Sequence, residues 1–138
     1  MRKVALCGVL ALEPKVLILD EPTVALDYQS REEIMAMVKR LKEEFDMTIV
    51  LVTHNMDYVL EYADKVFVLK NGEISFEGKV EDLFLNEQVL KENSLELPEV
   101  LKFYRKLEAN NIALNVFPRK YDELINALKN KIGSSRNE

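Results

Sequence analysis

Two short runs of apolar residues constrain the fold of this chain more than any other feature. Residues 16–19 (VLIL) and 48–53 (TIVLVT) are continuous and rich in β-branched side chains, which is typical of strands covered on both faces. The segment between them carries one amphipathic stripe at spacings of four, three and four: Ile34, Val38, Leu41 and Phe45. A strand, a helix and a second strand in this order predict a right-handed crossover in a parallel sheet, and therefore an α/β fold.

The helix between these strands has two candidate caps. Ser30 and Glu33 have the spacing of a capping box, so the helix is predicted to begin at Ser30. Asp27 lies shortly before it and is also a residue type that caps helices. Within the helix, Met35 and Met37 are predicted to be packing residues.

The composition changes after the second strand. Residues 56–62 and 80–84 are predicted to be short helices, and between them Asn71-Gly72 is the turn signal of a hairpin. Two amphipathic helices near the C-terminus have apolar stripes at two sets of positions: Val100, Leu101, Tyr104 and Leu107, then Tyr121, Leu124, Ile125 and Leu128. The predicted parts are a core at 1–84, a polar linker at 85–97, a helical extension at 98–132 and a disordered tail at 133–138.

Composition places the chain among soluble globular proteins and narrows its partners. The formal net charge of −5 over 138 residues argues against a nucleic-acid partner, because such proteins usually have a basic face. The single cysteine, Cys7, excludes an internal disulfide and fits a reducing cytosol. The apolar run around Cys7 is about nine residues long, far short of the roughly 20 that span a bilayer. We therefore expect a cytoplasmic protein without a membrane-spanning segment.

Acidic residues and a histidine follow the two predicted strands. Asp20 and Glu21 come after the first strand, and Thr53 and His54 come at the end of the second. Because the carboxyl ends of parallel strands meet where ligands collect, we expect these side chains to lie close together. Asp20 could hold a hard cation such as Mg2+ while Glu21 polarises a water, and His54 could contact developing phosphate charge. A helix cap or solvated loop for the acids, and an ordinary loop histidine, are the structural alternatives.

The sequence stretches LILDEPT, ALD and LVTHNMD occur in this order, and jointly they resemble the ATPase subunits of ATP-binding cassette (ABC) transporters. The resemblance implies that residues 16–20 are the Walker B strand, with Asp20 binding Mg2+. It also implies that Glu21 is the catalytic glutamate, which orients the water that attacks ATP.

The same resemblance assigns two further residues. Residues 25–27 are similar to the D-loop, in which Asp27 would reach the nucleotide site of a partner ATPase. His54 is similar to the switch histidine that senses the γ-phosphate of ATP. The family often has proline after the D-loop aspartate, and this chain has Tyr28 there, so the local shape of the loop can differ.

The C-terminal region is similar to a more specific group. LELPEVLKFYRKLEANNIALN followed by DELINALKN resembles the extension of energy-coupling factor transporter ATPases, which are paired cytosolic subunits that drive uptake of vitamins or metal ions. The resemblance implies a P-loop NTPase core followed by a hairpin and a helical extension, with ATP and Mg2+ as cofactors. It further implies a second ATPase subunit and a transmembrane transporter subunit as partners, and a location on the inner face of the cell membrane.

A phosphate-binding loop is the part of such a site that this sequence lacks. None of its glycines begins the motif G-x-x-x-x-G-K-[ST], and the LSGGQ signature is also absent. Residues 1–14 resemble the segment directly after that signature and begin with basic, uncapped residues, so we expect the chain to correspond to the C-terminal half of a subunit. Alone, it is predicted to bind ATP weakly or not at all and to be poorly stable, because strand edges are left unpaired.

Two other functions remain open. A truncated, non-catalytic interaction module would keep the tail helices for subunit contact and would have lost hydrolysis. An ABC ATPase outside transport, in DNA maintenance or translation, is disfavoured by the acidic net charge and by the tail.

Overall fold

The computed structural model describes residues 8 and 14–134 and divides into two compact units, Met1–His54 and Asn55–Glu138. The apolar run around Cys7, whose sequence predicts a helix over residues 2–12 that ends before Pro14, lies outside the described residues apart from Gly8. Most of the tail predicted to be disordered also lies outside them. The predicted domain bounds stay predictions.

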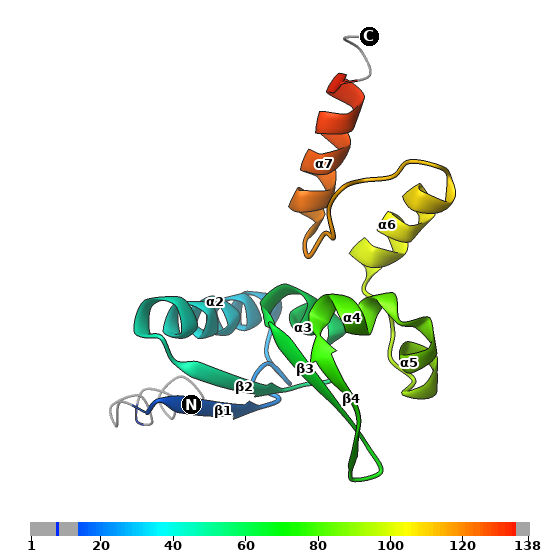
Figure 1. Ribbon diagram of the computed structural model, residues 1–138. Helices are drawn as coiled ribbons and strands as arrows, with labels where there is room; N and C mark the ends of the chain where they lie inside the picture. The colour runs from blue at the N-terminus through cyan, green and yellow to red at the C-terminus, as the bar shows by residue number, and fades with distance from the viewer. Residues whose placement is uncertain (1–7, 9–13, 135–138) are drawn as a thin grey trace. The chain divides into compact units, whose positions relative to one another are not determined.

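The first unit contains the predicted strand, helix and strand. Strands β1 (Val16–Asp20) and β2 (Thr48–Val52) pair in parallel, in register from their first residues to their last. The crossover between them is helix α2 (Tyr28–Phe45), which lies along one side of the strand pair (Figure 1). Parallel pairing through a helical crossover confirms the α/β prediction.

The strands of the first unit are well covered on one face only, and the prediction that both faces are covered is wrong. Leu17 is 4% exposed, whereas its neighbours Val16 and Ile18 are 52% and 67% exposed. On β2, Val50 and Val52 are also exposed. Successive side chains point to opposite faces of a strand, and α2 covers one of these faces. The opposite face is therefore an exposed apolar surface.

Helix α2 packs through Ile34, Met35, Val38 and Leu41. Met35 is completely buried, which confirms its prediction as a packing residue. Phe45 is 66% exposed, so its assignment to the buried stripe is wrong. It is the last residue of α2, where the chain turns away at the next residue in a left-handed conformation.

Asp27, and not Ser30, caps α2. The Asp27 carboxylate accepts hydrogen bonds from the Ser30 amide at 2.8 Å and from the Ser30 hydroxyl at 2.9 Å. The bond from the amide and then that from the hydroxyl lower the pKa of Asp27. The capping-box prediction is wrong because the helix begins earlier, at Tyr28, which makes Ser30 a donor to the cap and not the cap itself.

Replacing Asp27 with alanine is expected to lower the free energy of unfolding of the chain by about 1 kcal/mol, because the Ser30 amide loses its acceptor. Urea denaturation followed by circular dichroism measures the difference. Asp27→Asn keeps an acceptor oxygen and should recover most of the loss. Glu32→Ala, an exposed change on the same helix, serves as the control and should stay within about 0.5 kcal/mol of the original chain. Equal stability of the Asp27→Ala and Glu32→Ala variants would contradict the capping role.

The second unit contains a hairpin and, among the described residues, five helices. Strands β3 (Lys65–Lys70) and β4 (Glu73–Lys79) pair antiparallel. Asn71 and Gly72 have φ values of 53° and 82°, the positive angles that a tight two-residue turn uses, so the predicted hairpin is confirmed. The helices are α3 (Met56–Tyr62), α4 (Val80–Leu85), α5 (Glu87–Glu92), α6 (Glu99–Ala109) and α7 (Tyr121–Ser134).

Helix α4 provides the most deeply buried side chains of the second unit. Val80, Leu83 and Phe84 are each at most 1% exposed. They cluster with Leu60 from α3 and Leu101 from α6, so one core joins the short helices to the C-terminal extension. Burial of this kind supplies most of the stability of a small unit.

A helix lies in the segment predicted to be a polar linker. Asn86 caps α5 by accepting a hydrogen bond from the Val89 amide at 3.1 Å, and Leu90 is 6% exposed in the core. Leu95 and Leu97 pack against the same core. Four of the six residues of α5 are polar and its two apolar residues are adjacent, so the sequence shows no helical stripe, which is why this element was not predicted.

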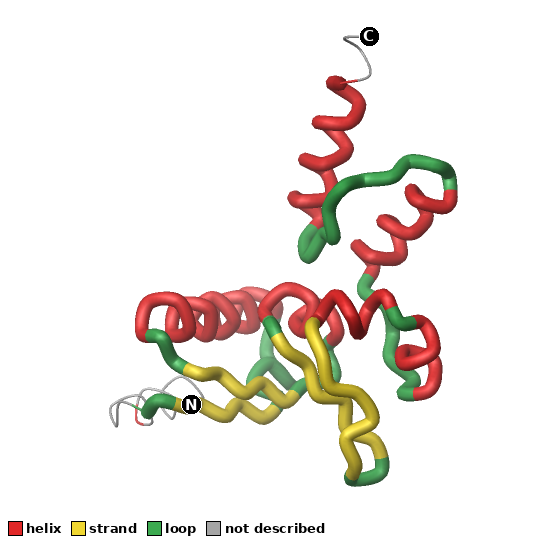
Figure 2. The backbone as a smooth tube through the Cα atoms, in the orientation of Figure 1, coloured by secondary structure: helices red, strands yellow, loops and turns green. Residues whose placement is uncertain are grey.

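Arg119 ties the C-terminal extension to the rest of the second unit. It lies in the irregular segment 110–120 that connects α6 and α7, drawn in green in Figure 2. Its guanidinium donates to the Ala63 carbonyl at 2.9 Å and to the Glu81 carboxylate at 2.6 Å. The hydrogen bond from Arg119 is the main reason that the pKa of Glu81 is lowered.

Candidate functional site

Glu21 and His54 lie together just beyond the ends of β1 and β2. The Glu21 amide donates to the Val52 carbonyl at 2.9 Å, which extends the strand pairing by one residue. The His54 amide donates to Glu21 Oε1 at 2.9 Å, and His54 Nδ1 lies 2.5 Å from the same oxygen. Thr53 Oγ1 donates to Glu21 Oε2 at 3.3 Å. The side chains of distant residues therefore meet at the carboxyl ends of the strands, as the sequence predicts.

The backbone of Glu21 is in the left-handed region, with φ at 44°. This conformation is uncommon for a residue other than glycine and costs on the order of 1 kcal/mol. The bond to Val52 and a bond of 3.3 Å from the Val24 amide to the Glu21 carbonyl hold the turn. Five other described non-glycine residues also have a positive φ, so the angle alone does not mark a functional site; at Glu21 it coincides with a side chain that meets His54.

The carboxyl group of Glu21 is held in its ionised form. Burial acts to raise its pKa, but hydrogen bonds from the ring and amide of His54, attraction to the His54 ring and the Thr53 hydroxyl outweigh that effect. The net result is a lowered pKa, so Glu21 is a carboxylate at neutral pH. The His54 side chain is 83% exposed and that of Glu21 is 30% exposed, which leaves the imidazole open to a ligand.

Asp20 and Asp27 do not join this pair. Asp20 is the exposed last residue of β1, and within the described part of the chain no hydrogen bond or ion pair connects it to Glu21 or His54. Asp27 begins α2, and both of its carboxylate oxygens bind Ser30. Among residues 8 and 14–134, no group of three or more histidine, cysteine or acidic side chains could hold a metal ion. The structure thus brings together two of the four predicted site residues.

Thr53 also belongs to the site. The sequence predicts that it lies at the strand end but gives it no role. Its hydroxyl binds the Glu21 oxygen that His54 leaves free. The signal in the sequence is positional, because Thr53 lies directly before His54 and directly after β2. A hydroxyl at that point is within reach of any acceptor at the same sheet edge.

No family model matches this sequence, but individual relatives do. The energy-coupling factor transporter ATP-binding protein EcfA2 of Enterococcus faecalis is 47% identical over 132 residues, which is 96% of this chain and 46% of that protein. EcfA2 of Ligilactobacillus salivarius is 40% identical over 139 residues, covering all of this chain and 48% of that protein. The chain belongs to the energy-coupling factor group of ABC transporter ATP-binding proteins. It spans about half the length of these curated relatives and corresponds to their C-terminal half.

Solved structures of ABC ATPases share the fold. CbiO1 from Clostridium perfringens, part of the ABC transporter complex CbiONQ, is 40% identical with a TM-score of 0.56 over 75% of this chain and 41% of that one. The ATP-binding cassette MJ0796, in a dimeric post-hydrolysis state with ADP and Pi, is 37% identical with a TM-score of 0.53 over 57% of this chain and 34% of that one. These matches confirm both the resemblance to ABC ATPases and the predicted fold class, a partial P-loop NTPase core.

Proposed function

We propose that this chain carries the water-activating part of an ATP hydrolysis site in an energy-coupling factor transporter ATPase. The observation that carries the proposal is the contact of 2.5 Å between Glu21 and His54 beyond the ends of two parallel strands. In this proposal Glu21 orients the attacking water, His54 contacts the γ-phosphate, and Asp20 binds Mg2+. The 47% identity to an energy-coupling factor transporter ATP-binding protein supports ATP as the nucleotide and transport as the process. The cargo that we propose, a vitamin or a metal ion, follows from the family resemblance of the sequence motifs.

The residues present fit Mg2+ and ATP in part. The exposed carboxylate of Asp20 is a suitable ligand for a hard cation, and Mg2+ sites in phosphoryl-transfer enzymes use one or two carboxylates and take other ligands from phosphate. The 138 residues hold no G-x-x-x-x-G-K-[ST] motif to cradle that phosphate. Asp20 alone is therefore expected to bind Mg2+ feebly. Tight binding of Mg2+-ATP requires a phosphate cradle from outside these residues.

The observed geometry corresponds to a resting arrangement of the proposed site. Glu21 Oε1 is bound by His54, and Oε2 is bound by Thr53. Each carboxylate oxygen can accept two hydrogen bonds, so Oε2 can accept one from a water beside Thr53, whereas both contacts of His54 fall on Oε1. We infer that the exposed His54 ring turns from Glu21 to the phosphate when ATP binds, which would free Oε1 for the water.

The proposed partners are a second ATPase subunit and a transmembrane transporter subunit. Dimeric structures of the cassette MJ0796 support the first partner. Asp27 would reach that partner from its position at the start of α2, in addition to its contacts with Ser30. Within the described residues, every helix is too short or too polar to cross a bilayer. In this proposal the transmembrane subunit holds the chain at the inner face of the membrane.

A non-catalytic interaction module is the second candidate. The observation that favours it is the lack of the phosphate-binding motif within the 138 residues. The retained contact between Glu21 and His54 counts against it, because a module that only docks has no need for a carboxylate beside an imidazole at the strand ends.

A chimera that joins the N-terminal half of the Enterococcus faecalis relative to this chain separates the two candidates. We expect the chain alone to show no micromolar affinity for Mg2+-ATP, and the chimera to bind ATP and release phosphate. Isothermal titration measures binding, and a phosphate assay measures turnover. The intact relative is the positive control. A chimera that folds and binds ATP without hydrolysing it would favour the interaction module.

A further inference from the structure

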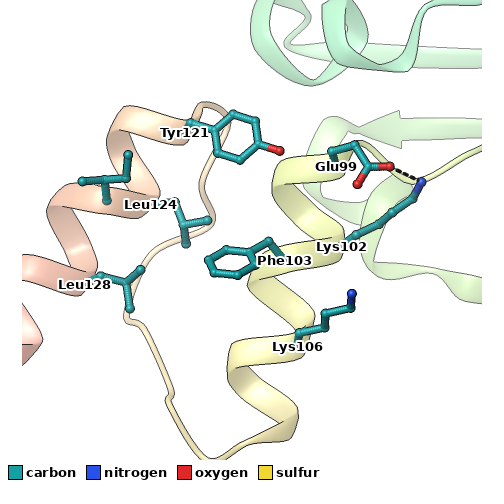
Figure 3. A pocket seen from close by; sticks show the side chains of 8 residues that line it. Glu99, Lys102, Phe103, Lys106, Tyr121, Leu124 and Leu128 are labelled. Atoms are coloured by element: carbon teal, nitrogen blue, oxygen red, sulfur yellow. Dashed lines mark hydrogen bonds and ion pairs between the residues drawn. The ribbon is translucent and has the colours of Figure 1, made fainter.

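Helices α6 and α7 enclose a groove that the proposed ATP chemistry does not use. Its volume is about 540 Å³, and Figure 3 shows the side chains that line it. The ring of Phe103 points from α6 toward Leu124 and α7. Tyr121 and Glu99, at the starts of the two helices, lie at one end of the groove, and Leu128 and Lys106 lie toward the other end. Both helices therefore run in the same direction along it.

The groove is apolar but is not part of the core. Leu124 is 1% exposed and belongs to the core cluster of the second unit. Phe103, Tyr121 and Ile125 are 46%, 53% and 43% exposed and stand outside that cluster. A contiguous exposed apolar strip beside a buried leucine is characteristic of a docking surface.

The charge at the groove is positive. Lys102 and Lys106 both line the groove from α6, one helical turn apart. Lys102 is paired with Glu99 at 2.6 Å, which raises the pKa of its ammonium group. Within the described residues, the Lys106 ammonium has no ion pair or hydrogen bond. The uncompensated charge therefore lies at the Lys106 end, on a chain whose net charge is −5.

We propose that this groove binds an acidic amphipathic helix of a partner protein. The apolar stripe of that helix would lie on Phe103 and Ile125, and its carboxylates would face Lys106. Because α6 ends at Ala109, three residues after Lys106, its negative dipole end favours a partner helix whose positive N-terminus lies there, antiparallel to α6. Acidic residues are common in the first turn of a helix, so the carboxylates of the partner helix would lie at its N-terminus, which is the end that faces Lys106. Helix α6 has 11 residues, so the groove matches a partner of about three turns.

Binding of two synthetic helical peptides to the 138-residue chain tests the proposal. Both peptides carry leucines at spacings of three and four over about 12 residues. One has two glutamates in its first turn, and the other has two lysines at the same positions. Fluorescence anisotropy of the labelled peptides gives the dissociation constants. We expect the acidic peptide to bind, and the basic peptide to bind at least about fivefold more weakly.

Variants of the chain sharpen this test. Lys106→Glu is expected to weaken the acidic peptide by about fivefold to tenfold and to strengthen the basic one. Lys91→Glu, an exposed change on α5, which does not line the groove, should leave both affinities unchanged. Ile125→Glu should abolish binding of either peptide. Ile125 is 43% exposed, so this variant should keep its circular dichroism spectrum and thermal midpoint.

Three results would overturn the proposal. If the two peptides bind equally, the groove binds apolar side chains and does not select for charge. If neither peptide binds, the groove is not a binding site for a helix. Sedimentation of the unliganded chain as a dimer that Ile125→Glu dissociates would make a second copy the occupant. None of these measurements involves nucleotide, so failure of the groove proposal would say nothing against the proposed hydrolysis site.

Discussion

Replacing Glu21 with glutamine is expected to slow ATP hydrolysis by the chimera at least about a hundredfold, while ATP binding changes little. Glutamine has the shape of glutamate and can still accept a hydrogen bond from the His54 amide or Thr53. It lacks the negative charge that polarises a water, and its amide nitrogen cannot accept a proton. The loss should therefore appear in kcat and not in the dissociation constant of ATP. Single-turnover phosphate release and equilibrium titration with ATP measure the two quantities separately.

The matched control for Glu21→Gln is Glu32→Gln on the exposed side of α2, which removes one negative charge far from any predicted contact with ATP. Hydrolysis by this control should remain within about twofold of the original chimera. If Glu21→Gln also hydrolyses ATP at near the original rate, Glu21 is not the residue that activates water. If it loses ATP binding in parallel with hydrolysis, its role is structural.

Replacing Phe84 with alanine is expected to lower the free energy of unfolding of the second unit by about 3–5 kcal/mol. Phe84 is 1% exposed and packs in the cluster that joins α4 to α6, so its removal leaves a cavity that cannot refill with water favourably. Small domains have net stabilities of about 5–15 kcal/mol, so the change is a large fraction of the total. Urea denaturation of the 138-residue chain, followed by circular dichroism, measures the shift.

Phe67→Ala is the control for Phe84→Ala. Phe67 lies on β3 and is 51% exposed, so its truncation should cost less than about 1 kcal/mol, part of which is its contact with the Lys65 ammonium. Equal losses for the two variants would contradict the placement of α4 at the centre of the core. They would also remove the argument that the C-terminal extension folds with the rest of the second unit.

Local signals predicted many of the elements correctly. The turn at Asn71 and Gly72 was predictable because its positive φ angles depend on these two residue types and on nothing distant. The strands β1 and β2 were predictable from composition, and the crossover between them followed from their order. The buried stripe on α2 was predicted in part. Ile34, Val38 and Leu41 are buried as expected, but Phe45 lies at the helix end and stays exposed.

Elements that depend on their neighbours were predicted less well. The sequence contains two adequate caps for α2, and only the position of the first helical turn decides that Asp27 binds Ser30 and not the reverse. Helix α5 is mostly polar and shows no helical stripe, and its Leu90 is recognisable as a core residue only when the rest of the cluster is in place.

The sequence by itself determined which chemical groups stand at the strand ends, because Asp20, Glu21 and His54 follow the apolar runs directly. It also determined the family, through motifs that are short and local. Only the tertiary structure decided that Glu21 is bound by both Thr53 and His54, and that Asp27 is occupied as a cap. The physical reason is distance: a contact across more than 30 residues depends on the register of β1 against β2, and strand register is a property of the assembled sheet.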